Sequence, residues 1–246
     1  MKASIPRFMC GLVVSMLAVA ASVQAQHFVV QKDGQTREGE VLGVRGGSIR
    51  IKIGPAETSI PLTSVRSVKM DPPADFTKLV EIYRQGDAAT ALPKFQDLLN
   101  QFKDLPADWV ERAHALLPEV YLSMEKTAEA EAASRDFEKK YPASSNSIPL
   151  LQAKLAIAKK DFSVAREKLS PLVSLARQTM RPKGDDAVAC SQALFLMGRI
   201  QEQSGEKSEA LQNYLLVSTI FNQNSSATTQ SRERASVLEK ENIMVP

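Results

Sequence analysis

Cysteine and histidine are scarce in this chain: two of each occur among 246 residues. A structural zinc site needs several such ligands at short spacing, and neither His27 nor His114 has a second His or Cys close by in sequence. The chain also lacks a Gly-rich phosphate loop and a Gly-flanked nucleophile turn. We therefore expect no metal site, no cofactor and no enzymatic activity. A hydrolase of unrecognised type that uses His114 stays open as an alternative.

Two pairs of neighbouring carboxylates have the composition of an acid–base site. Glu38 and Glu40 lie in a segment with strand-like alternation, and Asp185 and Asp186 precede a helical segment. We interpret the first pair as part of a solvated strand face. We expect an aspartate of the second pair to cap the following helix, because Asp is a favoured N-cap residue.

Long apolar runs are also rare. The only one extends from Phe8 to about Ala21, after Lys2 and Arg7, and it is shorter than the roughly 20 residues of a comfortable membrane span. Val23-Gln24-Ala25 then supplies small residues at a cleavage position. This pattern predicts a secretory signal over residues 1–25, and hence a periplasmic or secreted protein without stable membrane insertion after cleavage. An uncleaved N-terminal anchor is the alternative.

The cysteines exclude an intramolecular disulfide in the mature chain. Cys10 stands at the start of the apolar run, where lipidation is not expected, and it is removed with the signal. Cys190 is then single. Its neighbours Ala187-Val188-Ala189 are small and apolar, which favours a buried helix residue over the alternative of a reactive thiol.

Neither sign of charge dominates. The chain has 31 basic and 28 acidic residues, and loss of Lys2 and Arg7 leaves 29 against 28, a net charge of +1. A nearly neutral protein has no general attraction to nucleic acid. We expect no nucleic-acid partner.

The segment 26–71 has the period of β-strands. Ile49, Ile51 and Ile53 alternate with Ser48, Arg50 and Lys52, which predicts one buried face and one solvated face. Asp33-Gly34, Gly46-Gly47 and Gly54-Pro55 are turn signals, and Glu40–Val44 is a second strand. These patterns predict five short strands. The order resembles a small SH3-like or Sm-like β-barrel, a resemblance that implies no activity.

From residue 74 onward the apolar period is helical, after the strand-ending Asp71-Pro72-Pro73. Four short stretches repeat a tight turn followed by a small residue and a bulky one. The small residues are Ala91, Ala130, Ala165 and Ala210, at intervals of 39, 35 and 45 residues. In the fourth copy Gly198, Gly205 and Tyr214 complete the pattern.

This pattern resembles the tetratricopeptide repeat (TPR), a helix–turn–helix unit of 34 residues. The resemblance covers residues 74–224 and implies a mainly α protein: a TPR-like α-solenoid of about four helix pairs, preceded by the small five-stranded β-barrel. An irregular all-helical domain is the alternative. Extra residues around 178–186 predict a polar loop, and Pro118 and Pro171 fall inside predicted helices. Residues 225–246 are predicted to form a capping helix and tail, with a disordered tail as the alternative.

The resemblance also implies a binding groove, because the first helix of each TPR pair lines the concave surface. Alignment of the copies assigns the partner-binding residues Tyr83, Arg112, Leu150, Lys154, Phe195 and Arg199. It also assigns Phe76, Val80, Glu119, Leu122, Ile157, Gln192 and Glu202. Apolar residues beside basic ones suit a peptide or helix with an acidic group or a terminal carboxylate.

We therefore predict an exported protein–protein interaction scaffold or adaptor of the cell envelope, with a protein or peptide partner. A solvated basic face on the strand module is expected from Arg45, Arg50, Lys52, Arg66 and Lys69. The alternative function uses that face to bind cell-wall polymer or an anionic membrane surface.

Overall fold

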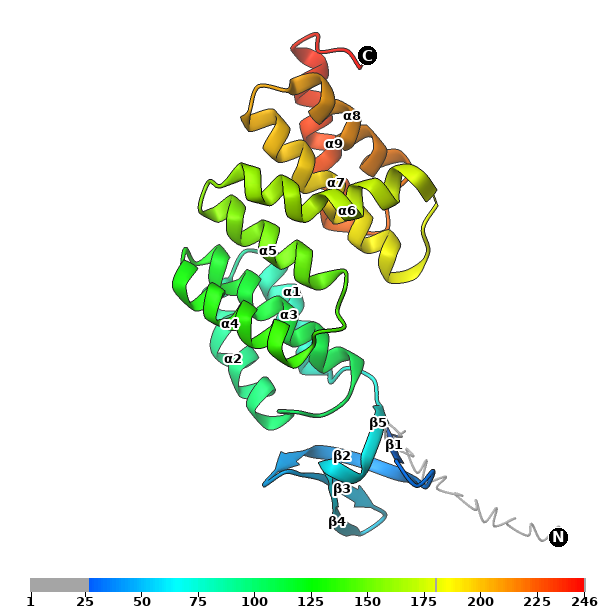
Figure 1. Ribbon diagram of the computed structural model, residues 1–246. Helices are drawn as coiled ribbons and strands as arrows, with labels where there is room; N and C mark the ends of the chain where they lie inside the picture. The colour runs from blue at the N-terminus through cyan, green and yellow to red at the C-terminus, as the bar shows by residue number, and fades with distance from the viewer. Residues whose placement is uncertain (1–26, 180, 246) are drawn as a thin grey trace, which may run out of the picture.

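The computed structural model describes residues 27–179 and 181–245. Within them a small five-stranded antiparallel sheet precedes nine α-helices, so the chain is mostly helical (Figure 1). The predicted signal segment, including Cys10 and the cleavage position after Ala25, lies outside the described residues. No helix in the described part of the chain combines the length and apolarity needed to cross a membrane.

The sheet has the strand order β4-β3-β2-β1-β5, and every neighbouring pair is antiparallel. Its strands are β1 (His27–Gln31), β2 (Thr36–Arg45), β3 (Ser48–Ile53), β4 (Ala56–Pro61) and β5 (Val65–Lys69), with a 3₁₀ turn at Leu62–Ser64. The three predicted turns join β1 to β2, β2 to β3 and β3 to β4. The second strand is longer than its sequence pattern indicated: its first half pairs with β1 and its second half with β3.

The alternation in β3 produces a buried face only in part. Ile49 and Ile51 are fully buried. Ile53, which was expected beside them, is 37% exposed, because it pairs with Ala56 next to the turn of the β3–β4 hairpin, at the tip of the sheet. The apolar face of the sheet is completed by Val29, Val41, Ile60, Val65 and Val68, all buried.

Eight of the helices form consecutive pairs, and Figure 1 shows the pairs stacked one after another with the sheet at one end. The pairs are α1 (Ala74–Arg84) with α2 (Ala88–Gln101), α3 (Asp108–Ser123) with α4 (Thr127–Lys140), α5 (Ser147–Ala158) with α6 (Phe162–Thr179), and α7 (Gly184–Gln203) with α8 (Lys207–Thr219). A final helix, α9 (Ser225–Lys240), packs on α8 and α7.

The turns inside the four pairs are the same. Each has one residue in the left-handed region: Gly86 (φ 92°), Glu125 (φ 59°), Lys160 (φ 61°) and Gly205 (φ 84°). In every case its N–H donates to the carbonyl three residues earlier, and the next N–H donates to the carbonyl five residues earlier. This is the Schellman pattern of helix ends. The four copies therefore share one backbone geometry, although only two of them have glycine at this position.

The small residue of each copy lies five positions after that turn and is fully buried: Ala91, Ala130, Ala165 and Ala210 each have 0% exposure. Gly198 of α7 packs directly on α8. A Cβ atom at Gly198 would lie 2.8 Å from Cε1 of Tyr214, so the two helices approach too closely for a larger residue.

The sheet is attached to the first helices by backbone and side-chain contacts. The Val68 N–H donates to the Pro106 carbonyl at 2.9 Å, and the Gln101 amide donates to the Leu42 carbonyl at 3.0 Å. The buried residues of the sheet and those of α1–α3 form one continuous hydrophobic cluster. At the other end of the helical stack, α9 covers the last pair with Ala227, Ala235 and Leu238.

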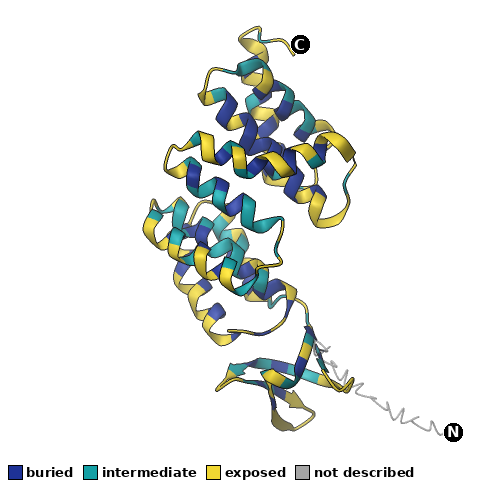
Figure 2. Cartoon of the chain, viewed as in Figure 1, coloured by how far each residue is buried: buried dark blue, intermediate teal, exposed yellow. Residues whose placement is uncertain are grey.

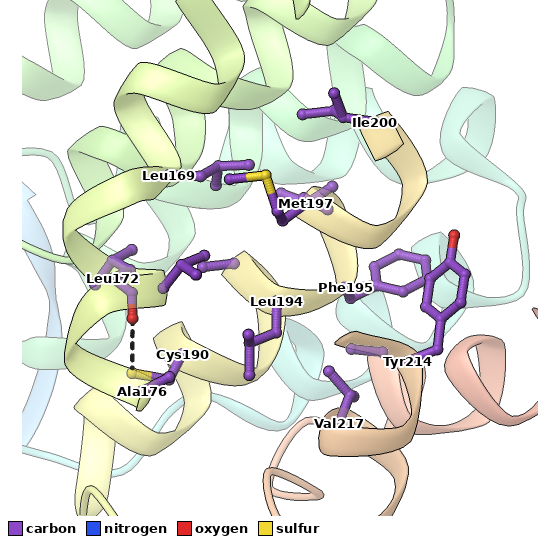
Figure 3. Packing of buried hydrophobic residues seen from close by; sticks show 14 of the residues in the cluster. Leu169, Leu172, Ala176, Cys190, Leu194, Phe195, Met197, Ile200, Tyr214 and Val217 are labelled. Atoms are coloured by element: carbon purple, nitrogen blue, oxygen red, sulfur yellow. Dashed lines mark hydrogen bonds between the residues drawn. The ribbon is translucent and has the colours of Figure 1, made fainter. Parts of the chain in front are cut away.

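The fourth pair has the most extensive core (Figure 2). Figure 3 shows Cys190 of α7 among buried side chains, with its Sγ 3.5 Å from the carbonyl oxygen of Leu172. Burial raises the pKa of this thiol, so the protonated, unreactive form is favoured. The structure thus agrees with a packing role for Cys190.

One local prediction about this region was wrong. No aspartate caps α7: the N-cap position is Lys183, and it makes no side-chain cap hydrogen bond. Asp185 and Asp186 fall in the first turn instead, because the helix already begins at Gly184. Asp186 there accepts a hydrogen bond from the Asn146 amide at 2.7 Å. Pro118 and Pro171 lie inside helices, as predicted.

Candidate binding groove

The odd-numbered helices α1, α3, α5, α7 and α9 together line an open groove of about 580 Å³. Helices α3 and α5, α5 and α7, and α7 and α9 are in direct contact, so the groove crosses the stack of pairs. Its lining residues are Val80, Tyr83, Arg84, Leu116, Glu119, Leu122, Ser123, Lys154, Ile157, Ala158, Gln192, Phe195, Leu196, Arg199, Asn224, Ser226, Ala227 and Gln230.

The repeated turn explains why these residues share one surface. Val80, Glu119, Lys154 and Arg199 each stand six positions before the left-handed residue of their own pair. Three positions closer to the turn come Tyr83, Leu122 and Ile157, which also line the groove. Residues separated by three positions are neighbours on a helix face. Equivalent positions therefore form two parallel rows along the groove.

Four of the six predicted partner-binding residues lie in this groove: Tyr83, Lys154, Phe195 and Arg199. Leu150 does not, since it is 7% exposed and packs in the core around α5–α9. Arg112 is exposed on α3 but lies outside the groove, which crosses α3 only between Leu116 and Ser123.

Some of the other residues assigned by the alignment also line the groove, and others do not. Val80, Glu119, Leu122, Ile157 and Gln192 line the groove. Phe76 is instead a core residue, 2% exposed, whose ring contacts those of Phe95 and Trp109. Glu202 lies in a neighbouring hollow.

Sequence reasoning missed the contribution of α9 to the groove. Its N-cap residue Asn224 and its residues Ser226 and Gln230 line the groove, although this helix was interpreted only as a cap. Arg84, at the end of α1, was missed as well. The feature that marks Arg84 in the sequence is its position directly after Tyr83. Ser123 has the equivalent position in α3, and it also lines the groove.

The charges in the groove do not balance. Lys154 Nζ lies 2.7 Å from Glu119 Oε1, and both side chains are mostly buried, with 18% and 23% exposure. Arg84 and Arg199 form no ion pair with any residue that the structure describes. Three cations against one carboxylate give the lining a net charge of +2. The two unpaired guanidinium groups favour a negatively charged ligand.

The lining mixes apolar and charged residues, and three of its four charged residues lie on α1, α3 and α5. The part formed by α1, α3 and α5 includes Val80, Tyr83, Leu116, Leu122 and Ile157. Burial and the nearby Glu119 carboxylate raise the pKa of Tyr83, so its hydroxyl stays neutral and can donate a hydrogen bond. The part formed by α7 and α9 surrounds Arg199 with amide and hydroxyl groups.

A second hollow of about 510 Å³ adjoins the groove and shares Phe195, Arg199 and Gln230 with it. Here Glu202 accepts hydrogen bonds from the Tyr214 hydroxyl at 2.9 Å and from Arg234 Nε at 3.1 Å. Burial opposes ionisation of Glu202, but the bonds from Arg234 and Tyr214 outweigh it, and the pKa of the carboxyl is lowered. Glu202 thus engages Arg234 and leaves Arg199 available.

Each of the two histidine rings contacts a polar group of a neighbouring residue. His27 Nδ1 accepts a hydrogen bond from the Val41 N–H at 2.9 Å, and burial lowers the pKa of its ring. His114 Nε2 lies 3.0 Å from Lys140 Nζ, and burial together with the Lys140 charge lowers its pKa to about 4. Among the described residues no Ser, Thr or Cys side chain hydrogen-bonds to either ring, and no cluster of potential metal ligands occurs.

The basic residues of the sheet are interspersed with acidic ones. Arg50 Nε lies 2.5 Å from Glu57 Oε1, and the strand register sets Lys52 opposite both Glu57 and Glu40. Lys69 stands opposite Phe28, whose other neighbour in the register is Glu38. Arg45 and Arg66 are exposed at other points of the module. The register therefore dilutes the positive charge that the sequence suggested.

Comparison of the chain with protein-family models, with curated proteins and with solved structures finds no match in any of the three.

Proposed function

We propose that this protein is an exported, non-catalytic adaptor of the cell envelope that binds a peptide segment of a partner protein in the groove. In this proposal the four helix pairs are a TPR-like solenoid, and the sheet is a small β-barrel attached to its first pairs. Export through a signal cleaved after Ala25 is part of the same proposal.

The observation that carries the proposal is the unpaired Arg199 beside apolar groove residues. Peptide-binding grooves combine apolar contacts with a few polar groups that fix orientation. A carboxylate on the ligand would form charge-assisted hydrogen bonds with the Arg199 guanidinium. Leu122 and Ile157, both partly exposed, supply apolar contact area in the same groove. The expected ligand is a peptide segment with an acidic residue or terminal carboxylate next to apolar side chains.

A peptide-library selection tests this proposal. Peptides selected on the purified protein should be enriched in acidic residues flanked by apolar ones. An Arg199→Glu variant removes one attraction and adds a repulsion, so we expect binding to weaken at least about tenfold, which corresponds to roughly 1.4 kcal/mol. Fluorescence anisotropy of a labelled selected peptide measures the dissociation constant.

The matched control is Arg181→Glu, which makes the same charge change at an exposed residue outside the groove. It should bind the selected peptide as the parent protein does. Equal loss with both variants would show that general charge drives binding. Unchanged binding by Arg199→Glu would refute the assignment of this groove.

The sheet surface has less support as a binding site, because its cations lie beside carboxylates in the strand register. Sedimentation with anionic vesicles or isolated cell wall distinguishes the two functions. Salt-sensitive sedimentation that persists in Arg199→Glu and is lost in an Arg45→Glu, Lys52→Glu variant would favour the sheet.

A further inference from the structure

The hydrophobic interior is divided at the junction of the second and third helix pairs. One cluster of buried residues joins the sheet to α1, α2 and α3. A second cluster joins α5, α6, α7, α8 and α9. Ala130 and Phe137 of α4 and Leu151 of α5 are buried but belong to neither cluster. Each half therefore has its own continuous core, and the two cores are separate from one another.

Polar contacts connect the halves at this junction. On the groove side Lys154 of α5 pairs with Glu119 of α3 at 2.7 Å. On the outer side Lys159 Nζ lies 2.5 Å from Glu131 Oε1 of α4, and the Gln152 amide donates to Glu138 at 3.1 Å. We call these three contacts the ionic seam. Ion pairs and hydrogen bonds of this kind, exposed or partly buried, contribute much less stability than a continuous apolar interface.

The outer side of the junction is also open. A cleft of about 280 Å³ lies there, lined by residues of α4, α5 and α6. Glu131, Glu138, Gln152 and Lys159 of the seam are among them. Side chains at this position are consequently less tightly enclosed than those inside either half. Figure 2 shows α5 largely in the colour of intermediate burial, in contrast to α7.

We propose that the ionic seam is a hinge and that the two halves move about it as rigid bodies. Rigid halves follow from the continuous cores, because packed interiors resist deformation. The groove crosses the hinge: α1 and α3 line one end, with Tyr83 and Arg84, and α7 and α9 line the other, with Arg199. Movement at the seam changes the separation of Tyr83 and Arg199. If the groove binds a peptide as proposed above, its width is set by this hinge.

Through the ion pair between Glu119 and Lys154, the charge of a ligand in the groove affects the hinge. It faces the groove, so a ligand carboxylate competes with Glu119 for Lys154. Loss of that pair removes the groove-side contact of the seam while the outer contacts stay. The hinge is then freer to open on the groove side.

Distances between spin labels on the two halves test the hinge without any ligand, so this test can fail independently of the groove proposal. Cysteines replace the exposed Thr77 of α1 and Ser236 of α9 in a chain with Cys10→Ala and Cys190→Ala. In Glu119→Gln, Glu131→Gln, and in the parent at 1 M NaCl, we expect a wider distance distribution with a shifted mean. High salt screens mainly the more exposed outer pair, Glu131–Lys159, because the Debye length falls to about 3 Å, and it screens the mostly buried Glu119–Lys154 pair less.

Two controls decide the interpretation. Glu206→Gln breaks the Arg166–Glu206 pair, which also measures 2.5 Å but lies inside the second half, and it should leave the distribution unchanged. Labels at Ser163 and Ser236, both in the second half, should report one narrow distance in all variants. The hinge is refuted if the seam variant and high salt leave the Thr77–Ser236 distance unchanged. It is equally refuted if Glu206→Gln or the within-half labels broaden as much.

Discussion

Replacement of Gly198 by alanine probes the close contact between α7 and α8. An ideal Cβ at this position lies 2.8 Å from Tyr214 Cε1, 3.1 Å from Cδ1 and 3.2 Å from Cζ. The ring has little freedom to move away. It is fully buried, and its hydroxyl donates to Glu202, which also binds Arg234.

Two opposing effects set the magnitude. Alanine in a helix interior is favoured over glycine by about 1 kcal/mol, whereas overpacking a well-packed core typically costs about 1–3 kcal/mol. The expected net effect of Gly198→Ala is therefore a loss of roughly 1 kcal/mol in the free energy of unfolding. For a chain of this size that loss lowers Tm by about 2–4 °C.

Urea and thermal denaturation followed by circular dichroism measure this change. The control is a double-mutant cycle with Tyr214→Leu, which removes the ring that the new methyl group would meet. In that background Gly198→Ala should stabilise the protein by about 1 kcal/mol, as helix propensity alone predicts. Stabilisation of the same size in both backgrounds would refute the close contact.

Three further predictions follow from the turns, the histidine and the sheet. Lys160→Gly should stabilise the protein by up to about 1 kcal/mol, because glycine adopts positive φ without strain, whereas Gly205→Ala should destabilise it by a similar amount in the same denaturation assay. The free energy of unfolding should fall by about 1–2 kcal/mol as the pH drops from 6.5 to 4. The reason is that His114 binds a proton in the unfolded chain over this range but stays neutral in the folded protein, where its pKa is about 4. The figure is reduced because His114 is partly exposed. His114→Gln should flatten this part of the pH profile, and an unchanged slope would contradict it. Deletion of residues 27–70 should lower the Tm of the helical part, because it removes the contacts of the sheet with Gln101 and Pro106 and exposes part of their shared core; an unchanged Tm would mean that the two parts are independent.

The repeat pattern predicted the helix pairs well, because its signals are local. A left-handed turn residue, a small residue five positions later and a bulky residue on the same face are all set by short-range geometry. The turns at Glu125 and Lys160 were found although neither has glycine, since the small residues Ala130 and Ala165 marked the same register.

The groove was harder to predict, because the positions at which neighbouring helices cross determine which residues line it. Arg112 and Phe195 are both assigned by the same alignment, but the groove crosses α7 near its middle and α3 only in its second half. The crossing points depend on loop lengths and packing angles that no single-helix pattern contains. The contribution of α9 was missed for the same reason. The exposure of Ile53 has a different cause, its position next to the β3–β4 turn.

The seam between the halves was also not predictable from the sequence. Glu119 and Lys154 were assigned to the groove without any pairing, and Glu131 and Lys159 are ordinary charged residues in the sequence. Only the packing of α5 against α3 and α4 joins them in pairs.

Site-specific crosslinking in the intact cell envelope tests the central claim, that the groove binds a partner, most directly. A photoreactive amino acid replaces Gln192 in the groove or, as a control, the exposed Ser163 on α6. We expect one discrete adduct from position 192 that is lost in Arg199→Glu and kept in Arg181→Glu, and mass spectrometry should place the crosslink in an acidic peptide segment. Equal adducts from positions 192 and 163, or an adduct that persists in Arg199→Glu, would contradict it.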